Sequence, residues 1–216
     1  MSEKYELVRD VIRERQTVKV LADVDQPLRT PESVLERGNA VVLESIRESG
    51  WAPFHYPRNL DGIVEPWRAH VLWQSQSQTV ARWLRDELQD DSKLPQLLAG
   101  CSAVVLVTWL PEDAASSPVP EKVTHRNHEH LAAAASMTQN LLLLLTAAGF
   151  GTYWSSGGNL TKLPAKTKVG MNEDESLLGA IFVDYGSGEG IIGKKPGAHR
   201  DKRSSEWIRE VTQDSL

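Results

Sequence analysis

The sequence contains a single cysteine, Cys101, among its 216 residues. One thiol can form neither an intramolecular disulfide nor a metal cluster built from thiolates, and so few cysteines are typical of proteins in a reducing compartment. The N-terminal segment also lacks an apolar stretch followed by a cleavage site of small residues, so we do not expect a secretory signal. These absences favour a cytoplasmic protein.

An excess of positive charge is also missing. Lys and Arg number 24 against 29 Asp and Glu, which leaves a formal net charge of −5. A chain of this charge is repelled by phosphate backbones, so we expect no nucleic-acid partner. The composition, with 40% apolar and 25% charged residues, is that of an ordinary globular protein, and the length fits one domain spanning residues 1–216.

Charged residues are absent from residues 131–161, a run long enough to raise the question of a membrane span. Polar residues such as Ser136 and Gln139 interrupt the first half of the run, and glycines break up the second half. We therefore expect no membrane span and predict a long buried helix that begins close to His125. Because this helix is apolar nearly all round, it needs cover on every side, which a partner subunit could supply.

Shorter periodic segments surround this helix. Helices are predicted at the N-terminus, from a Thr30 N-cap and Pro31 to Gly50, over 77–98 and over 159–168, and strands are predicted over 18–21, 68–73, 102–110 and 177–184. These elements alternate without the regular strand–helix–strand spacing of a doubly wound fold. The pattern predicts an α+β fold in which helices sandwich a sheet.

Two familiar kinds of catalytic site have little support. No Gly-x-Ser-x-Gly segment is present to place a hydrolase nucleophile. Among the clustered histidines His125, His128 and His130, only the first two have the spacing of metal ligands on one helix. We predict no metal site and interpret these histidines as a polar, exposed helix start.

Basic and glycine-rich segments leave several interpretations open. Arg15-Gln16-Thr17, with Lys19 beyond, pairs a guanidinium with a hydroxyl, as a phosphate site would, but a solvated helix end has the same composition. The basic stretch that includes Lys194 and Arg200 is either a solvated tail or an anion site. Residues 186–190 are rich in glycine but lack nucleotide-motif spacing, which indicates a flexible turn.

A long loop follows the second predicted helix. It begins at Trp51 and runs on to Trp67, and long loops in compact domains are often functional. His55 lies in its proline-bounded first part, where an imidazole could donate to a ligand or simply cap the loop backbone.

The order of these features along the chain resembles the nitroreductase family of flavoenzymes, and the resemblance covers most of the chain. Its parts are Arg15-Gln16-Thr17-Val18-Lys19, Pro53-Phe54-His55, Pro66-Trp67-Arg68, the helix and its exit over 129–154, the strand over 178–186, and Lys202 to Trp207. The sequence departs from the family pattern at Gln16, which replaces a second arginine, and in the extra residues between His55 and Glu65.

The resemblance implies an α+β fold with a central, mostly antiparallel sheet flanked by helices. It also implies a homodimer formed through the long helices, with FMN in a cleft built from both subunits. The residues it places around FMN are Arg15, Gln16, Thr17, Lys19, Pro53, His55, Trp154, Ser155, Ser156, Lys202 and Arg203. Arg15 and Thr17, with Arg203 and Lys202, would hold the phosphate or ribityl chain. Trp154, Ser155 and Ser156 would line the isoalloxazine ring, and His55 would approach it from the partner chain.

The resemblance further implies an NAD(P)H-dependent oxidoreductase. Reduced nicotinamide would pass a hydride to the flavin, leave, and be replaced by a small-molecule acceptor such as a nitroaromatic, a quinone or an enone. FMN would carry this chemistry without a catalytic side chain. The alternatives are a specialised relative, such as a reductive dehalogenase or a flavin-cleaving enzyme, and a redox-silent flavin-binding dimer.

Overall fold

The computed structural model of the chain describes residues 2–186, 188–196, 204 and 206–211. Its helices are α1 (Glu3–Glu14), α2 (Glu32–Ser49), α3 (Gln74–Asp86), α4 (Leu94–Ala99), α5 (Pro120–Ala147), the 3-10 helix η1 (Gly158–Thr161) and α6 (Leu163–Lys168). Its strands are β1 (Val18–Ala22), β2 (Trp67–Trp73), β3 (Ala103–Trp109), β4 (Gly151–Ser155), β5 (Ser176–Asp184) and β6 (Ile191–Pro196).

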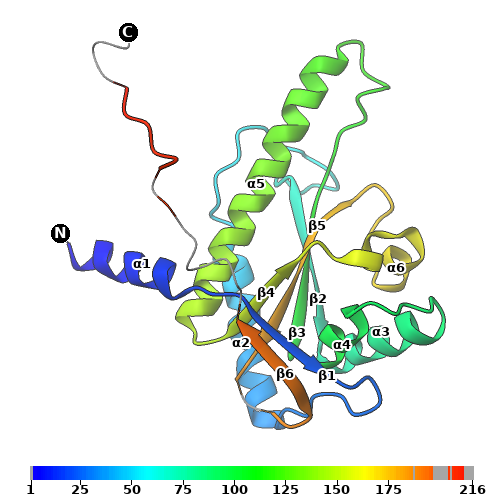
Figure 1. Cartoon of the computed structure of the whole chain (residues 1–216). Helices are drawn as coiled ribbons and strands as arrows, with labels where there is room; N and C mark the ends of the chain where they lie inside the picture. The colour runs from blue at the N-terminus through cyan, green and yellow to red at the C-terminus, as the bar shows by residue number, and fades with distance from the viewer. Residues whose placement is uncertain (1, 187, 197–203, 205, 212–216) are drawn as a thin grey trace.

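An antiparallel sheet in the order β2-β3-β5-β4 forms the centre of the molecule (Figure 1). β1 pairs antiparallel with β6 beside this sheet, and a parallel bridge between Thr17 and Thr152 ties it to β4. The predicted α+β fold with an antiparallel sheet is therefore confirmed.

Helices cover both faces of the sheet, and β3 shows why the sequence requires this. Val104 and Leu106 of β3 pack with α3, α4 and α6, whereas Val105 and Val107 pack with α2 and α5. All four side chains are fully buried. A strand covered on both faces is apolar at consecutive positions, because neither set of alternating side chains faces water.

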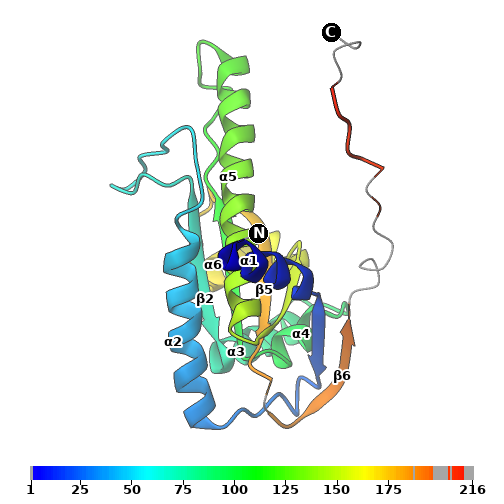
Figure 2. The same ribbon diagram turned by 90° about the vertical axis from the view of Figure 1, so that its left-hand side faces the viewer.

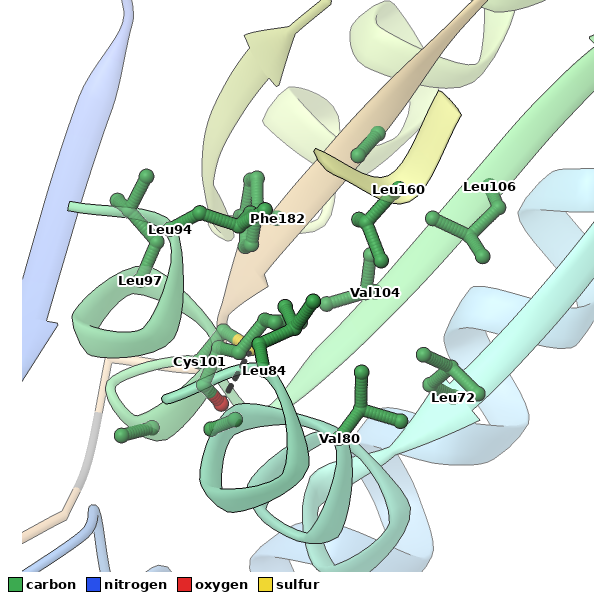
Figure 3. Close-up of a cluster of buried hydrophobic side chains, with 14 of the residues drawn as sticks. Leu72, Val80, Leu84, Leu94, Leu97, Cys101, Val104, Leu106, Leu160 and Phe182 are labelled. Atoms are coloured by element: carbon green, nitrogen blue, oxygen red, sulfur yellow. Dashed lines mark hydrogen bonds between the residues drawn. The ribbon is translucent and has the colours of Figure 1, made fainter. Parts of the chain in front are cut away.

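The core on the α3 side is built largely from leucines (Figure 3). Leu84, Leu98, Leu106 and Leu160 are fully buried there. Cys101 lies in the same core, where its thiol donates to the carbonyl of Leu98 (3.4 Å) and burial raises its pKa to about 12. A thiol in this environment is unreactive.

The long helix α5 buries one face against the sheet and leaves another uncovered by the described residues. Ala134 and Leu141 face the core, whereas Ala132 and Gln139 are exposed. The helix has 28 residues and begins at Pro120, earlier than the predicted start near His125, because a proline fits well in a first helical turn. No helix in the described ranges is long and apolar enough to span a membrane.

Two predicted helices differ from the structure. The segment predicted as one helix over 77–98 forms α3 and α4, separated by a turn in which Gln89 has a positive φ (51°). Predicted helix 159–168 forms η1 and α6, with Pro164 in the first turn of α6. Neither break has a glycine to mark it.

The start of α2 also differs by one residue. Pro31, rather than Thr30, occupies the N-cap position, and no side chain caps the helix. The Thr30 hydroxyl instead accepts a hydrogen bond from the Gln74 side-chain amide (2.8 Å) and so links the loop before α2 to α3.

α1 lies apart from the core. None of its residues is buried, and it stands out from the body beside the lower half of α5 (Figures 1 and 2). Its large apolar side chains Leu7, Val8 and Ile12 are 61%, 57% and 45% exposed.

Replacing Leu106 by alanine tests the importance of the central core. We expect Leu106→Ala to lower the free energy of unfolding by roughly 2–5 kcal/mol, because it removes a fully buried side chain from a strand packed on both faces. Arg82→Ala, on the exposed side of α3, is the control and should change it by less than about 0.5 kcal/mol. Chemical denaturation measures both, and equal losses would contradict the assignment of the core.

Candidate functional site

Three of the predicted cofactor-binding residues line one pocket. Arg15, Thr17 and Trp154 surround a cavity of about 420 Å³. Ile12 of α1 and two residues of α5, Gln139 and Leu142, complete its lining. The pocket, called the Arg15 pocket below, thus lies where the end of α1, the start of β1, α5 and β4 meet.

Local structure fixes the position of each of these residues. Arg15 caps the C-terminus of α1, and its backbone N–H donates to the carbonyl of Val11 (3.0 Å). Thr17 is held by its bridge to Thr152 of β4. Trp154 lies against Gly179 of β5, where a Cβ would come within 2.1 Å of the indole nitrogen, so the absence of a side chain at this glycine makes room for the indole.

The chemistry of the lining suits an amphipathic anion. A guanidinium and a hydroxyl are good hydrogen-bond donors to phosphate, and the Gln139 amide can form hydrogen bonds with the hydroxyls of a polyol. The indole of Trp154, which is 36% exposed, and the side chains of Ile12 and Leu142 offer apolar surface. These residues fit a ligand that combines a phosphate, a polyol chain and an aromatic ring, as FMN does.

Pro53 and His55 lie in a second pocket. It measures about 350 Å³ and is lined by Pro53, Phe54, His55, Glu129, Ala132, Ala133 and Ser136. The exposed His55 ring stacks on Tyr56, with centroids 4.4 Å apart, and Phe54 packs edge-on against Trp67. We call this the His55 pocket.

The two pockets lie on consecutive turns of one side of α5. Ser136 lines the His55 pocket and Gln139 lines the Arg15 pocket. Residues three apart share a helix face, and these two are separated by about 4.5 Å of helical rise. The structure therefore arranges both groups of predicted site residues along one stripe of α5.

Four other predicted residues lie outside the lining of these pockets. The Lys19 ammonium is over the Tyr153 ring (4.4 Å to the centroid), and Gln16 is exposed. The Ser155 hydroxyl accepts a hydrogen bond from the backbone of Gly157 (3.2 Å), and Ser156 is exposed. Lys202 and Arg203, like Arg200 of the basic tail, lie outside the described residues.

Sequence reasoning missed the pocket residues of α5. Gln139 and Leu142 belong to the helix that carries the most specific part of the resemblance, yet neither was predicted to bind the cofactor. One feature of the sequence could have identified Gln139 as a binding residue, because it is a polar residue in the middle of a helix without charged neighbours. Leu142 had none, since an apolar residue in a buried helix usually belongs to the core.

The histidines near the start of α5 divide into two kinds. His125 and His128 are exposed, as predicted. His130 is only 1% exposed, and its Nε2 lies 3.2 Å from Glu112 Oε1. The prediction of an exposed polar helix start is wrong for His130, because α5 begins ten residues earlier at Pro120 and the segment after β3 folds back over it.

Glu112 links this segment to α5. It accepts hydrogen bonds from Arg126 Nε (2.9 Å) and Nη2 (2.6 Å). These bonds lower the pKa of Glu112 most, burial opposes them, and His130 adds to the lowering, so the pKa falls to about 2. Asn127 closes the link by exchanging hydrogen bonds with the backbone N–H and carbonyl of Glu112 (2.8 and 2.9 Å).

A separate buried carboxylate lies on the other face of the sheet. Glu175 is 1% exposed and accepts hydrogen bonds from Thr108 and from His70 Nε2 (2.7 Å). Burial alone would raise the pKa of Glu175, but these hydrogen bonds outweigh burial and lower it. This cluster joins β2 and β3 to the start of β5. Across the described residues, no three His, Cys, Asp or Glu side chains gather in an arrangement that could hold a metal ion.

Comparison with known proteins identifies the fold. No protein-family model matches the sequence, and no curated protein matches it. Solved structures do match over nearly the whole chain. A nitroreductase-like family protein from Bacillus cereus superposes with a TM-score of 0.57 and 19% identity, covering 91% of this chain and 94% of that one.

Two further structures carry FMN. A nitroreductase with bound FMN from Bacteroides fragilis has a TM-score of 0.56 and 16% identity, and the match covers 98% of this chain and 100% of that one. An oxidized iodotyrosine deiodinase bound to FMN and 3-iodo-L-tyrosine has a TM-score of 0.55 and 17% identity over 95% of this chain and 99% of that one. The similarity predicted from the order of motifs is thus confirmed in three dimensions: the chain has the nitroreductase-like fold.

Proposed function

We propose that this protein is an FMN-dependent oxidoreductase that takes reducing equivalents from NAD(P)H and passes them to small-molecule acceptors such as nitroaromatics, quinones or enones. The observation that carries the proposal is the Arg15 pocket, where Arg15, Thr17 and Trp154 meet on a nitroreductase-like fold. Two structures of similar fold contain FMN, which supports the choice of cofactor.

The roles of the pocket residues follow from their chemistry. Arg15 and Thr17 bind the FMN phosphate, and Gln139 donates to the ribityl chain or the ring edge. Trp154 offers its indole to the isoalloxazine ring, with Ser155 and Ser156 next to it. Bound FMN supplies the hydride chemistry, accepting a hydride from reduced nicotinamide and giving it to the acceptor. The protein positions both substrates and excludes water around them.

The proposed enzyme is a homodimer of single-domain subunits that works in the cytoplasm. In the described chain, the stripe of α5 with Ala132 and Gln139 and the apolar side chains of α1 are exposed. A second copy would cover these surfaces, since large exposed apolar patches usually mark interfaces. The dimer would also bring the partner subunit's His55 to the flavin ring and so complete a site that one chain leaves open.

A second candidate function is a reductive dehalogenation. It is favoured by the likeness to a structure of an iodotyrosine deiodinase with FMN and 3-iodo-L-tyrosine. A specialist of this kind, or a flavin-cleaving enzyme, should turn over nitroaromatics and quinones slowly. A redox-silent flavin-binding dimer would keep its flavin oxidised when mixed with NADH or NADPH without oxygen.

The cofactor itself gives the first test. The purified protein, or protein reconstituted with FMN, should be yellow, and anaerobic NADH or NADPH should bleach its flavin absorption. Added menadione or nitrofurazone should restore the colour. A protein that stays colourless after incubation with FMN would refute the proposal, and a flavin that nicotinamide does not bleach would favour the redox-silent alternative.

Arg15→Ala tests the phosphate site. The variant removes a charge-assisted hydrogen bond of roughly 1.5–3 kcal/mol, so FMN should bind about tenfold to a hundredfold more weakly. Titration of the apoprotein with FMN, followed by flavin fluorescence, measures the affinity. Arg82→Ala is the control, because exposed Arg82 lies in α3 on the other face of the sheet. Equal affinities for both variants would place Arg15 outside the site.

Trp154→Leu tests the ring site. An indole next to the isoalloxazine quenches its fluorescence, so the bound flavin should become brighter in the variant. Trp83→Leu is the control, since Trp83 lies under Lys168 on the opposite side of the sheet. Identical emission from flavin bound to wild type and to Trp154→Leu would show that Trp154 does not touch the ring.

A further inference from the structure

The loop over 53–66, between α2 and β2, contains the residues that the family pattern does not account for. Figure 2 shows it leaving the upper end of α2 and standing out from the body before it returns to β2. Asn59, Asp61 and Gly62 at its tip have positive φ values of 50°, 55° and 76°. Exposed backbone of this kind has little apolar packing to hold it, so its shape depends on hydrogen bonds.

Arg58 supplies two side-chain hydrogen bonds that fasten this loop to the segment after β3. Its Nε donates to the carbonyl of Leu110 (3.1 Å) and its Nη2 donates to the carbonyl of Pro111 (3.3 Å). Its backbone N–H donates to the carbonyl of Val64 (2.8 Å) across the loop. Arg58 thus connects both sides of the loop to the segment that follows β3.

A second arginine holds the base of the loop. Arg68 Nη2 donates to the carbonyl of Leu60 (3.0 Å), and Nη1 donates to the carbonyls of Glu65 (3.0 Å) and Trp67 (2.8 Å). These partners are all backbone carbonyls within or next to the loop. Arg68 therefore stabilises the internal shape of the loop, whereas Arg58 fixes the position of the loop relative to the segment after β3.

The segment that receives Arg58 is itself fastened to α5. Glu112 follows Pro111 directly and is held by Arg126, Asn127 and His130 of α5. Because the pKa of Glu112 is about 2, it stays ionised at any pH at which the enzyme would work. A continuous set of hydrogen bonds therefore runs from Arg58 through residues 110–112 to α5.

A pocket lies between the two surfaces that this set of bonds joins. It measures about 510 Å³ and is lined by Tyr56 from the loop and by Glu121, Lys122, His125 and Arg126 from α5. Tyr56 stacks on His55 on one side and meets the His125 ring edge-on on the other, with centroids 6.5 Å apart. This pocket therefore adjoins the His55 pocket through the stacked rings of Tyr56 and His55. In the proposed function His55 reaches the flavin ring of the other subunit, and the acceptor must lie against that ring to receive a hydride.

We propose that Arg58 is a positioning residue that selects acceptors by size. By binding the Leu110 and Pro111 carbonyls it holds Tyr56 and His55 at a set separation from the first turns of α5. Flat acceptors that fit this separation are reduced, and wider ones are disfavoured. This inference rests on the proposed function, since it concerns the acceptor half of that reaction.

Arg58→Met tests the role of the guanidinium while keeping a side chain of similar length. Amides of residues 57–66 should exchange with deuterium about tenfold faster or more, because the loop loses its fastening. In this variant the displaced wall should admit the wider menadione and lower its KM. The kcat/KM for 1,4-benzoquinone divided by that for menadione should therefore fall about tenfold. FMN affinity should stay at the wild-type value, because Arg58 lies outside the lining of the Arg15 pocket.

Two further variants separate positioning from a general structural effect. Arg58→Lys keeps the charge but cannot reach two carbonyls with one planar fork, so its exchange rate and quinone ratio should lie between those of wild type and Arg58→Met. Arg82→Met, which removes an exposed arginine from α3, should match wild type in every measurement.

The outcomes distinguish this inference from the proposed function. An unchanged quinone ratio in Arg58→Met would overturn the inference while leaving the oxidoreductase intact, and so would a loop whose exchange rate stays the same. A loss of FMN affinity in Arg58→Met would also overturn it, since that indicates general damage. If wild type reduces neither quinone with NADH or NADPH, the proposed function itself fails and the acceptor role of Arg58 fails with it.

Discussion

The packing of α5 against β3 is the contact on which the rest of the structure depends. Fully buried side chains of α5, such as Ala134 and Leu141, lie on Val105 and Val107 and thereby orient the whole helix. Since residues three or four apart share a helix face, burial of this side turns Ala132, Ser136 and Gln139 outward on another. Both pockets of the candidate site lie along that outward stripe. The same burial that stabilises the core therefore sets the angle at which the helix presents its binding surface.

Four of the strands were predictable from the sequence, whereas β4, β6 and the ends of several helices were not. The continuous apolar run of β3 predicts a strand buried on both faces, and the tertiary contacts agree with that prediction. The break between α3 and α4 depends instead on a turn at Gln89, a residue type with no preference for positive φ, and the early start of α5 depends on Pro120 in a segment that resembles a linker. These ends are decided by packing that no local pattern records.

The candidate site shows the same division. Arg15, Thr17 and Trp154 were found through the order of motifs, which carries long-range information that spacing alone does not. The connection of Arg58 to Leu110 and Pro111 was not predictable, because it joins a side chain to backbone carbonyls far away in sequence. Every residue has a backbone carbonyl, so the acceptor of such a hydrogen bond can be any residue type and leaves no pattern in the sequence. His130 was misassigned for a related reason, since its partner Glu112 comes from a segment before the helix.

The replacement of an arginine by Gln16 has a structural explanation that limits its cost. The backbone between α1 and β1 is extended, and successive side chains in extended backbone point to opposite sides. Arg15 and Thr17 therefore share the side that lines the pocket, whereas Gln16 is exposed. A charge lost at position 16 would lie farther from an anion in the Arg15 pocket than one lost at position 15, and interactions of exposed charges fall quickly with distance in water. The departure from the family pattern thus falls where the proposed phosphate site would depend on it least.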